Sequence, residues 1–133
     1  MKDKGAKFSI RKRLASFKYA FSGLGSLIKH EHNSRLHLLI ALLVIAMGFI
    51  IDISRAEWMI LVIIIAIVFI TEILNSAIES LADYVSPEYS EIIKRVKDYC
   101  AAAVLIAAIT SVVVGLLIFL PKVIQILLTT MDN

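Results

Sequence analysis

The segment from Trp58 to Asp83, WMILVIIIAIVFITEILNSAIESLAD, decides the fold of this chain. Its first thirteen residues are all apolar, and acidic side chains then follow at Glu72, Glu79 and Asp83. A membrane-spanning helix needs about 20 predominantly apolar residues, so the segment crosses a bilayer only if Glu72 lies inside the hydrocarbon or close to its surface. The segment therefore predicts a transmembrane helix that carries acidic groups near one end.

The composition of the whole chain also indicates a membrane protein. Of its 133 residues, 59% are hydrophobic and 19% are charged, and the mean hydropathy is +0.87. Soluble domains have about 45–50% apolar and about 25% charged residues, and a soluble domain of this length could not bury so much apolar surface. The single cysteine, Cys100, excludes an intrachain disulfide framework and a paired-cysteine zinc site. We expect one integral membrane domain over residues 1–133.

Two further apolar stretches predict two further membrane spans. Leu36–Ile51 is interrupted only by His37, and Tyr99–Leu120 is followed directly by Pro121. Because proline lacks the N–H that a helix interior needs, we expect the last helix to end before it. The expected transmembrane helices cover residues 33–53, 56–82 and 97–120. The predicted fold class is therefore an all-α membrane protein with three spans.

The lysine and arginine residues predict the orientation in the membrane. Nine precede the first span, one lies in the loop 52–57, three lie between the second and third spans, and one follows the third. Cytoplasmic loops carry an excess of lysine and arginine. We therefore expect the N-terminus and the segment 83–98 to be cytoplasmic. The net charge of +3 is explained by this topology, and no nucleic-acid partner is needed.

The N-terminal segment 8–30 has the pattern of an amphipathic helix. Its apolar residues recur at spacings of four and three, which is typical of one helix face; they are Ile10, Leu14, Phe17, Phe21, Leu24 and Ile28. Basic residues occupy much of the remaining circumference. A basic amphipathic helix beside a membrane span usually lies in the headgroup plane. We expect a surface helix here.

Small residues form a stripe along the third predicted span. Ala103, Ala107, Ser111 and Gly115 are spaced by four, and such a pattern lets helix backbones approach closely in lipid. Alanine is abundant in this chain, so chance is the alternative explanation. We interpret the stripe as evidence for tight helix packing, and a homo-oligomer is expected because three helices alone make a thin bundle.

The polar residues of the second span share one helix face. At about 100° per residue, Glu72, Asn75, Glu79 and Asp83 fall within one stripe. The emergence of the helix into water explains Asp83 well and Glu79 in part. It does not explain Glu72, because a charged residue in the hydrocarbon costs about 2.5–3.5 kcal/mol on insertion scales and is usually functional.

The other two spans bring ionisable groups to the same membrane layer. Glu31 precedes the first span, and Lys97 and Asp98 begin the third. Clustered acids without cysteine favour a hard cation such as Mg²⁺, and a lysine ammonium suits a phosphate. Carboxylates, a metal ion and a lysine are the components of a phosphoryl-transfer site. The residues alone, however, predict only a polar site at the membrane interface, and phosphoryl transfer is one candidate for its chemistry. The alternative is a small transporter or accessory subunit that uses Glu72 as a proton or cation site, which leaves the other groups unexplained.

Taken together, these motifs resemble the prokaryotic diacylglycerol kinase family, which includes the undecaprenol kinases. The specific core is Glu72-Ile-Leu-Asn75-Ser-Ala-Ile-Glu79-x-x-x-Asp83 with Lys97-Asp98 after it, and the resemblance extends from about residue 13 to residue 120. It implies a homotrimer in the bacterial inner membrane with active sites between subunits. It also implies ATP- and Mg²⁺-dependent phosphorylation of a lipid alcohol. The expected acceptor is diacylglycerol, which gives phosphatidic acid, and the alternative is undecaprenol.

The resemblance also implies a role for individual residues. Glu72 is expected to be the general base and to contact the lipid together with Arg35, with Asn75 and Asp83 in support. Glu31 and Glu79 are expected to bind Mg²⁺. The expected nucleotide-binding residues are Lys12, Tyr19, Glu31, Glu79, Glu88, Tyr89, Ser90, Lys97 and Asp98. His37 replaces an acid of the best-known Gram-negative enzymes, so the acceptor stays open between diacylglycerol and undecaprenol.

Overall fold

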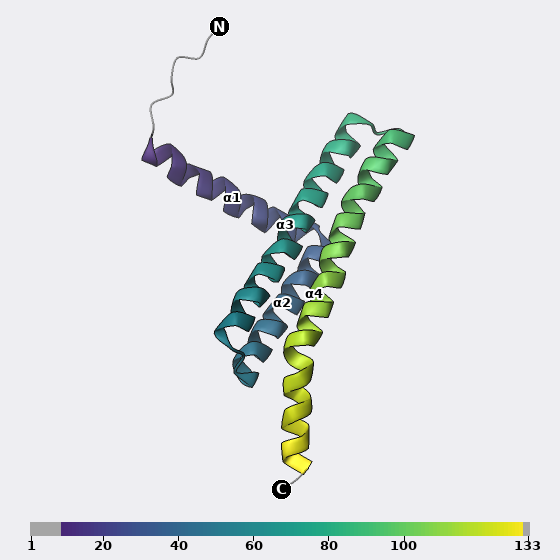
Figure 1. Ribbon diagram of the computed structural model, residues 1–133. Helices are drawn as coiled ribbons and strands as arrows, with labels where there is room; N and C mark the ends of the chain where they lie inside the picture. Colours follow the sequence, from purple (N-terminus) through teal and green to yellow (C-terminus); the bar gives the residue numbers. More distant parts are fainter. Residues whose placement is uncertain (1–8, 132–133) are drawn as a thin grey trace.

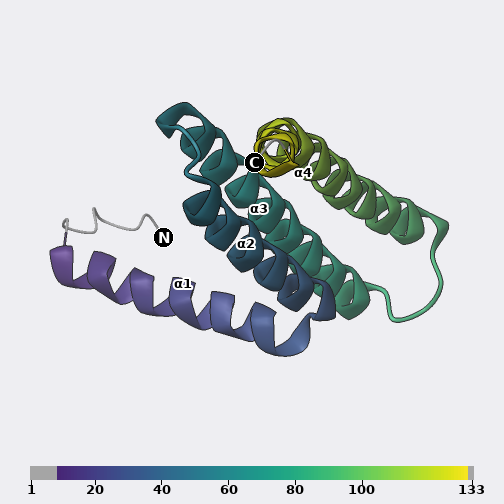
Figure 2. The same cartoon turned by 90° about the horizontal axis from the view of Figure 1, so that it is seen from below.

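The computed structural model describes residues 9–131, apart from the side chains of residues 11 and 12. This part of the chain forms four α-helices, which are α1 (Ile10–His30), α2 (His32–Ile51), α3 (Arg55–Val85) and α4 (Glu91–Met131). Figure 1 shows α2, α3 and α4 running side by side while α1 leaves the bundle at an angle. In Figure 2, α1 and α4 lie on opposite sides of the α2–α3 pair.

Three of these helices, α2, α3 and α4, are long and apolar enough to cross a membrane. They have 20, 31 and 41 residues, and a span needs about 20. The prediction of an all-helical chain with three spans is therefore confirmed. Most of their apolar side chains are exposed on the single chain, which is expected for surfaces that face lipid or other membrane helices.

The bounds of α3 and α4 extend past the predicted ones. α3 continues to Val85 and α4 begins at Glu91, so both helices reach well beyond the start of α2 (Figure 1). The prediction that the last helix ends at Pro121 is wrong, because α4 continues through Pro121 to Met131. Pro121 has no N–H and cannot donate to the carbonyl of Leu117. In an apolar environment, leaving the helix would expose many more backbone groups without hydrogen bonds, so the helix continues past the proline. In Figure 1, α4 changes direction where its colour turns from green to yellow.

The turn between α2 and α3 is fixed by local hydrogen bonds. Asp52 adopts the left-handed conformation with φ 54° and its N–H donates to the carbonyl of Gly48, which ends α2. Ser54 begins α3 with a capping box: its Oγ accepts from the N–H of Glu57 at 3.3 Å, and its own N–H donates to Oε2 of Glu57 at 2.6 Å. The turn therefore sets the angle at which α3 leaves α2.

α3 makes its most extensive contacts with α4, and the two helices run antiparallel. Near the α2–α3 turn, Lys122 pairs with Glu57 at 3.2 Å, and near the α3–α4 loop Lys97 pairs with Asp83. At about 1.5 Å per residue, these two ion pairs are about 39 Å apart along α3. Because the hydrocarbon layer is about 30 Å thick, the two pairs bracket more than its whole depth.

The hydrophobic core of the single chain is small and lies toward the α2–α3 turn. Its buried members come from the turn itself, from α3 and from α4; they are Ile53, Leu61, Ile64, Ile118 and Phe119. At the other end of the bundle the buried residues include polar ones, namely Ser34, Glu72 and Ser76. The chain thus has an apolar half that holds the helices together and a half in which polar groups are enclosed.

Candidate active site

The most deeply buried carboxylate among the described residues is Glu72. It lies on α3, is 2% exposed, and faces Ser34 of α2, which is 0% exposed. The Ser34 hydroxyl donates to Oε1 of Glu72 at 3.4 Å. The second oxygen, Oε2, is buried and accepts no hydrogen bond from the described residues, and the same holds for Oδ1 of Asn75. Glu72 and Asn75, which were predicted to share a helix face, both lie on α3, and each has one buried oxygen without a hydrogen-bond partner among the described residues.

A cavity of about 670 Å³ lies between α1 and α3, next to this carboxylate. Glu31, the residue that precedes α2, lines it together with Ser76, Ala77 and Ser80 of α3. Glu72 and Glu79 do not line this cavity, although each is adjacent along α3 to a residue that does. The cavity therefore opens beside the acidic stripe.

The two predicted metal ligands, Glu31 and Glu79, are both half-buried. Among the described residues, no three His, Cys, Asp or Glu side chains converge on one point. Their oxygen donors nevertheless fit Mg²⁺, which is usually bound by one or two carboxylates while phosphate and water complete its coordination. The unpartnered oxygen of Glu72 lies about 10 Å along α3 from Glu79, too far to share one Mg²⁺ with it, and stays available for another role. The donor chemistry of this face is therefore compatible with Mg²⁺.

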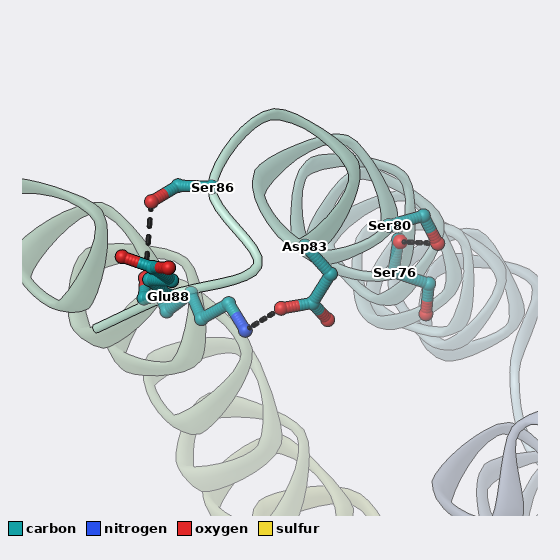
Figure 3. A network of polar contacts seen from close by, with 6 residues as sticks. Ser76, Ser80, Asp83, Ser86 and Glu88 are labelled. Atoms are coloured by element: carbon teal, nitrogen blue, oxygen red, sulfur yellow. Dashed lines mark hydrogen bonds and ion pairs between the residues drawn. The ribbon is translucent and has the colours of Figure 1, made fainter. Parts of the chain in front are cut away.

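A second cavity, of about 340 Å³, lies where α3 and α4 meet their connecting loop, and we call it the loop cavity. Its lining includes most of the predicted nucleotide-binding residues; the polar members are Asp83, Ser86, Glu88, Tyr89, Ser90, Lys94, Lys97 and Asp98. Figure 3 shows the loop end of α3, where Asp83 accepts from the ammonium of Lys97. In the same view the hydroxyl of Ser86 donates to the carbonyl of Glu88 at 3.0 Å.

Charged and hydroxyl groups of the loop cavity are paired with one another. Lys94 binds Asp98 at 2.6 Å, one turn apart on α4. The hydroxyl of Tyr89 donates to Oε2 of Glu91 at 2.6 Å, and this hydrogen bond raises the pKa of Tyr89 above its usual value. The cavity therefore contains two lysines, each already opposite a carboxylate.

Two of the remaining predicted site residues, Tyr19 and Arg35, line neither cavity. Tyr19 is on the exposed surface of α1, 76% accessible. Arg35 is exposed and donates from Nη2 to the carbonyl of Lys29 at 3.4 Å. The side chain of Lys12 lies outside the described residues. Neither Tyr19 nor Arg35 contacts Glu72 in the part of the chain that the structure describes.

A single chain does not bring Glu72 and Lys97 together. Lys97 binds Asp83, and Asp83 is about 16 Å from Glu72 along α3 at about 1.5 Å per residue. Within one chain Lys97 therefore meets the acidic stripe at Asp83 and not at Glu72. The spacing of residues predicted a shared helix face correctly, but α4 begins at Glu91, six residues before the predicted start at residue 97.

Sequence reasoning also missed two polar residues, Ser34 and Lys94. Ser34 contacts a residue 38 positions away in the chain, and no motif or periodicity indicates such a contact. Lys94 lines the loop cavity. In the sequence it is one of the three basic residues between the second and third spans, and the membrane topology was enough to explain its charge.

Three apolar helices with a buried acidic group and polar cavities at one end define a small integral membrane protein built around an enclosed polar site. The family model for prokaryotic diacylglycerol kinase matches residues 18–119. The chain is 35% identical to the undecaprenol kinase of Bacillus subtilis (strain 168), over 92% of this chain and 99% of that protein. It is 33% identical to a diacylglycerol kinase of Synechocystis, over 92% and 75% of the two chains, and 36% identical to that of Escherichia coli K12, over 71% and 78%.

The chain therefore belongs to the prokaryotic diacylglycerol kinase family. It is a lipid kinase and a bacterial membrane protein, so its substrate is a lipid. This result decides between the enzyme and the transporter hypotheses in favour of the enzyme.

Proposed function

We propose that the protein transfers the γ-phosphoryl group of ATP to the hydroxyl of a membrane lipid at the cytoplasmic leaflet, with diacylglycerol as acceptor and phosphatidic acid as product. The observation that carries this proposal is the enclosed carboxylate of Glu72, which has one oxygen free to accept a proton. A carboxylate at this depth is costly, so chemistry is the best reason for its presence.

In the proposed reaction Glu72 acts as the general base. Oε2 takes the proton of the lipid hydroxyl, and the hydroxyl oxygen forms a bond to the γ-phosphorus. The bond between that phosphorus and the oxygen bridging to the β-phosphate breaks, and ADP leaves with the electron pair. A positioned base contributes typically about 10²–10⁴-fold to such a step. The remaining acceleration comes from orientation and charge neutralisation.

The nucleotide would bind at the loop cavity, where Lys97 and Lys94 supply positive charge for phosphate oxygens. Glu88, Tyr89, Ser90 and Asp98 are the further candidates there. Glu31 and Glu79 would hold Mg²⁺, which when bound neutralises the charge of the triphosphate. Both lysines would exchange their present carboxylate partners, Asp83 and Asp98, for phosphate.

Lys97 pairs with Asp83, about 16 Å along α3 from Glu72, so a single chain does not place this lysine beside the base. We propose a homotrimer, with the Gly115 end of the small-residue stripe of α4 at the subunit contact. Ala107 is already buried within the single chain, whereas a Cβ at Gly115 would meet nothing within 4 Å there. A second copy therefore has room to approach α4 closely at Gly115.

The proposed orientation places the N-terminus and the α3–α4 loop in the cytoplasm, with α1 on the membrane surface. In support, the outer half of the apolar stripe of α1 is exposed on the single chain, with Ile10, Leu14, Phe17 and Phe21 each more than 60% accessible. Insertion of this face between headgroups would remove it from water.

Undecaprenol is the second candidate acceptor. The match to the Bacillus subtilis undecaprenol kinase covers 99% of that protein. His37 also replaces an acid on the helix that faces Glu72, and it lies on the side of α2 that packs toward α3. A change of charge near the base is a plausible determinant of the acceptor.

The test is to incubate the purified protein in lipid bilayers with Mg-ATP and, separately, with diacylglycerol or undecaprenol. We expect phosphorylated diacylglycerol to form at the higher kcat/KM. Faster phosphorylation of undecaprenol would assign the second acceptor instead. The absence of product with both alcohols would contradict the proposed reaction.

A further inference from the structure

The contact between Ser34 and Glu72 joins two helices and is fully enclosed. Ser34 lies in the first turn of α2, and its hydroxyl donates to Oε1 of Glu72 at 3.4 Å. Both side chains are at most 2% exposed. The distance is longer than the usual 2.7–2.8 Å of an O–H···O bond, but hydrogen bonds at catalytic groups are often long before substrate binds and then tighten.

The direction of the Ser34 hydroxyl is unusual for this chain. Several other hydroxyl groups within the helices donate to a carbonyl of their own helix three or four residues earlier; among them are Thr71, Ser80, Thr110 and Ser111. This is the ordinary way to satisfy a helical hydroxyl in an apolar environment. Ser34 instead donates to a side chain of a different helix.

We propose that Ser34 is a positioning residue for the catalytic base, and this proposal rests on the proposed role of Glu72. By occupying Oε1, the Ser34 hydroxyl leaves Oε2 as the oxygen that receives the proton of the lipid hydroxyl. A glutamate side chain has up to about 2 kcal/mol of conformational freedom to lose, and a fixed partner removes much of that freedom before the reaction. Ser34 therefore holds the carboxylate in one orientation.

The consequence for catalysis is specific. A misplacement of about 1 Å in a reacting group can cost about 10²-fold in rate. Loss of the Ser34 hydroxyl should lower kcat, because the carboxylate is no longer held, while the nucleotide still binds at the loop cavity, which Ser34 does not line. KM for Mg-ATP should therefore change little.

The experiment compares Ser34→Thr with Ser34→Val, two side chains of nearly equal volume that differ in the hydroxyl. We expect kcat of Ser34→Val to fall about 10–100-fold with KM for Mg-ATP unchanged within about twofold, and Ser34→Thr to retain most of the wild-type kcat. Equal kcat values for the two variants would overturn the positioning role. If both variants unfold in detergent because the site is too tight, Ser34→Ala serves instead and should show the same loss of kcat.

Thr71→Val is the matched control. Thr71 is adjacent to Glu72, but its hydroxyl donates to the carbonyls of Ile67 and Val68. This variant should keep kcat within about twofold of wild type. A loss as large as that of Ser34→Val would show that any hydroxyl removal here disturbs the helix, and would contradict a specific role for Ser34.

The two proposals fail in different ways. If Glu72→Gln keeps full activity, the base assignment is wrong and the role of Ser34 fails with it. If Glu72→Gln is inactive and Ser34→Val is as active as Ser34→Thr, only the positioning role is overturned.

Discussion

At Glu72 the chain maintains a carboxylate where a leucine would be more stable. Insertion scales assign about 2.5–3.5 kcal/mol to a charged residue at the centre of a membrane helix. One hydrogen bond to a charged group returns about 1.5–3 kcal/mol, and among the described residues Glu72 accepts only the one from Ser34. The residue is therefore retained at a net cost to stability, as expected for a group whose value lies in its reactivity.

Replacement of this carboxylate should separate activity from stability. Glu72→Gln keeps the size and the acceptor oxygen that faces Ser34 but removes the basic oxygen. We expect kcat to fall by about 10²–10⁴-fold or more, nucleotide affinity to stay within about twofold, and the midpoint of thermal unfolding in detergent to stay equal or rise. Full activity, or a large loss of nucleotide binding, would contradict the assignment.

At the scale of the helices, the α2–α3 turn depends on a close approach at Gly48. A Cβ on this residue would lie 2.9 Å and 3.0 Å from ring atoms of Trp58 and 3.1 Å from Cδ1 of Ile53. Trp58 also contacts Phe49, with the ring centroids 4.7 Å apart, and is itself half-buried. The indole therefore has little room to move away.

Gly48→Ala should consequently destabilise the fold. Overpacking of this kind costs typically about 1–3 kcal/mol, so we expect a clear decrease in the thermal unfolding midpoint, measured by circular dichroism in detergent. Gly25→Ala is the control, because a Cβ there meets nothing within 4 Å and alanine favours a helix interior by about 1 kcal/mol. An equal decrease in both variants would contradict the packing argument.

The sequence predicted the helices better than their ends and their contacts. The three apolar runs fixed the number of spans, since composition alone forces each run into lipid. The end of α4 was missed, because Pro121 ends helices in water but is tolerated where the neighbouring backbone must stay hydrogen-bonded. The stripe from Glu72 to Asp83 was predictable from helical periodicity. The partner of Glu72 was not, because the contact to Ser34 depends on how α2 and α3 pack.

At the scale of the whole molecule, the proposed trimer should depend on the small residue at Gly115. Gly115→Leu would fill the space beside α4 and hold subunits apart, so we expect a loss of trimer, measured by crosslinking in bilayers, and a parallel loss of activity. Val113→Leu is the control, because Val113 is exposed on the opposite side of the helix. An intact trimer in Gly115→Leu would show that the small-residue stripe is incidental.

The projection of α3 and α4 past the start of α2 (Figure 1) has a kinetic consequence. Because α3 and α4 carry the loop cavity past the start of α2, the phosphate donor would reach the lipid hydroxyl from the water side, and the acyl or prenyl chain would stay in the hydrocarbon during turnover. Substrate arrives and product departs by sideways diffusion within one leaflet. The rate should therefore follow the mole fraction of lipid alcohol in the bilayer, and dilution with inert phospholipid should slow it even when the bulk amount of alcohol is constant.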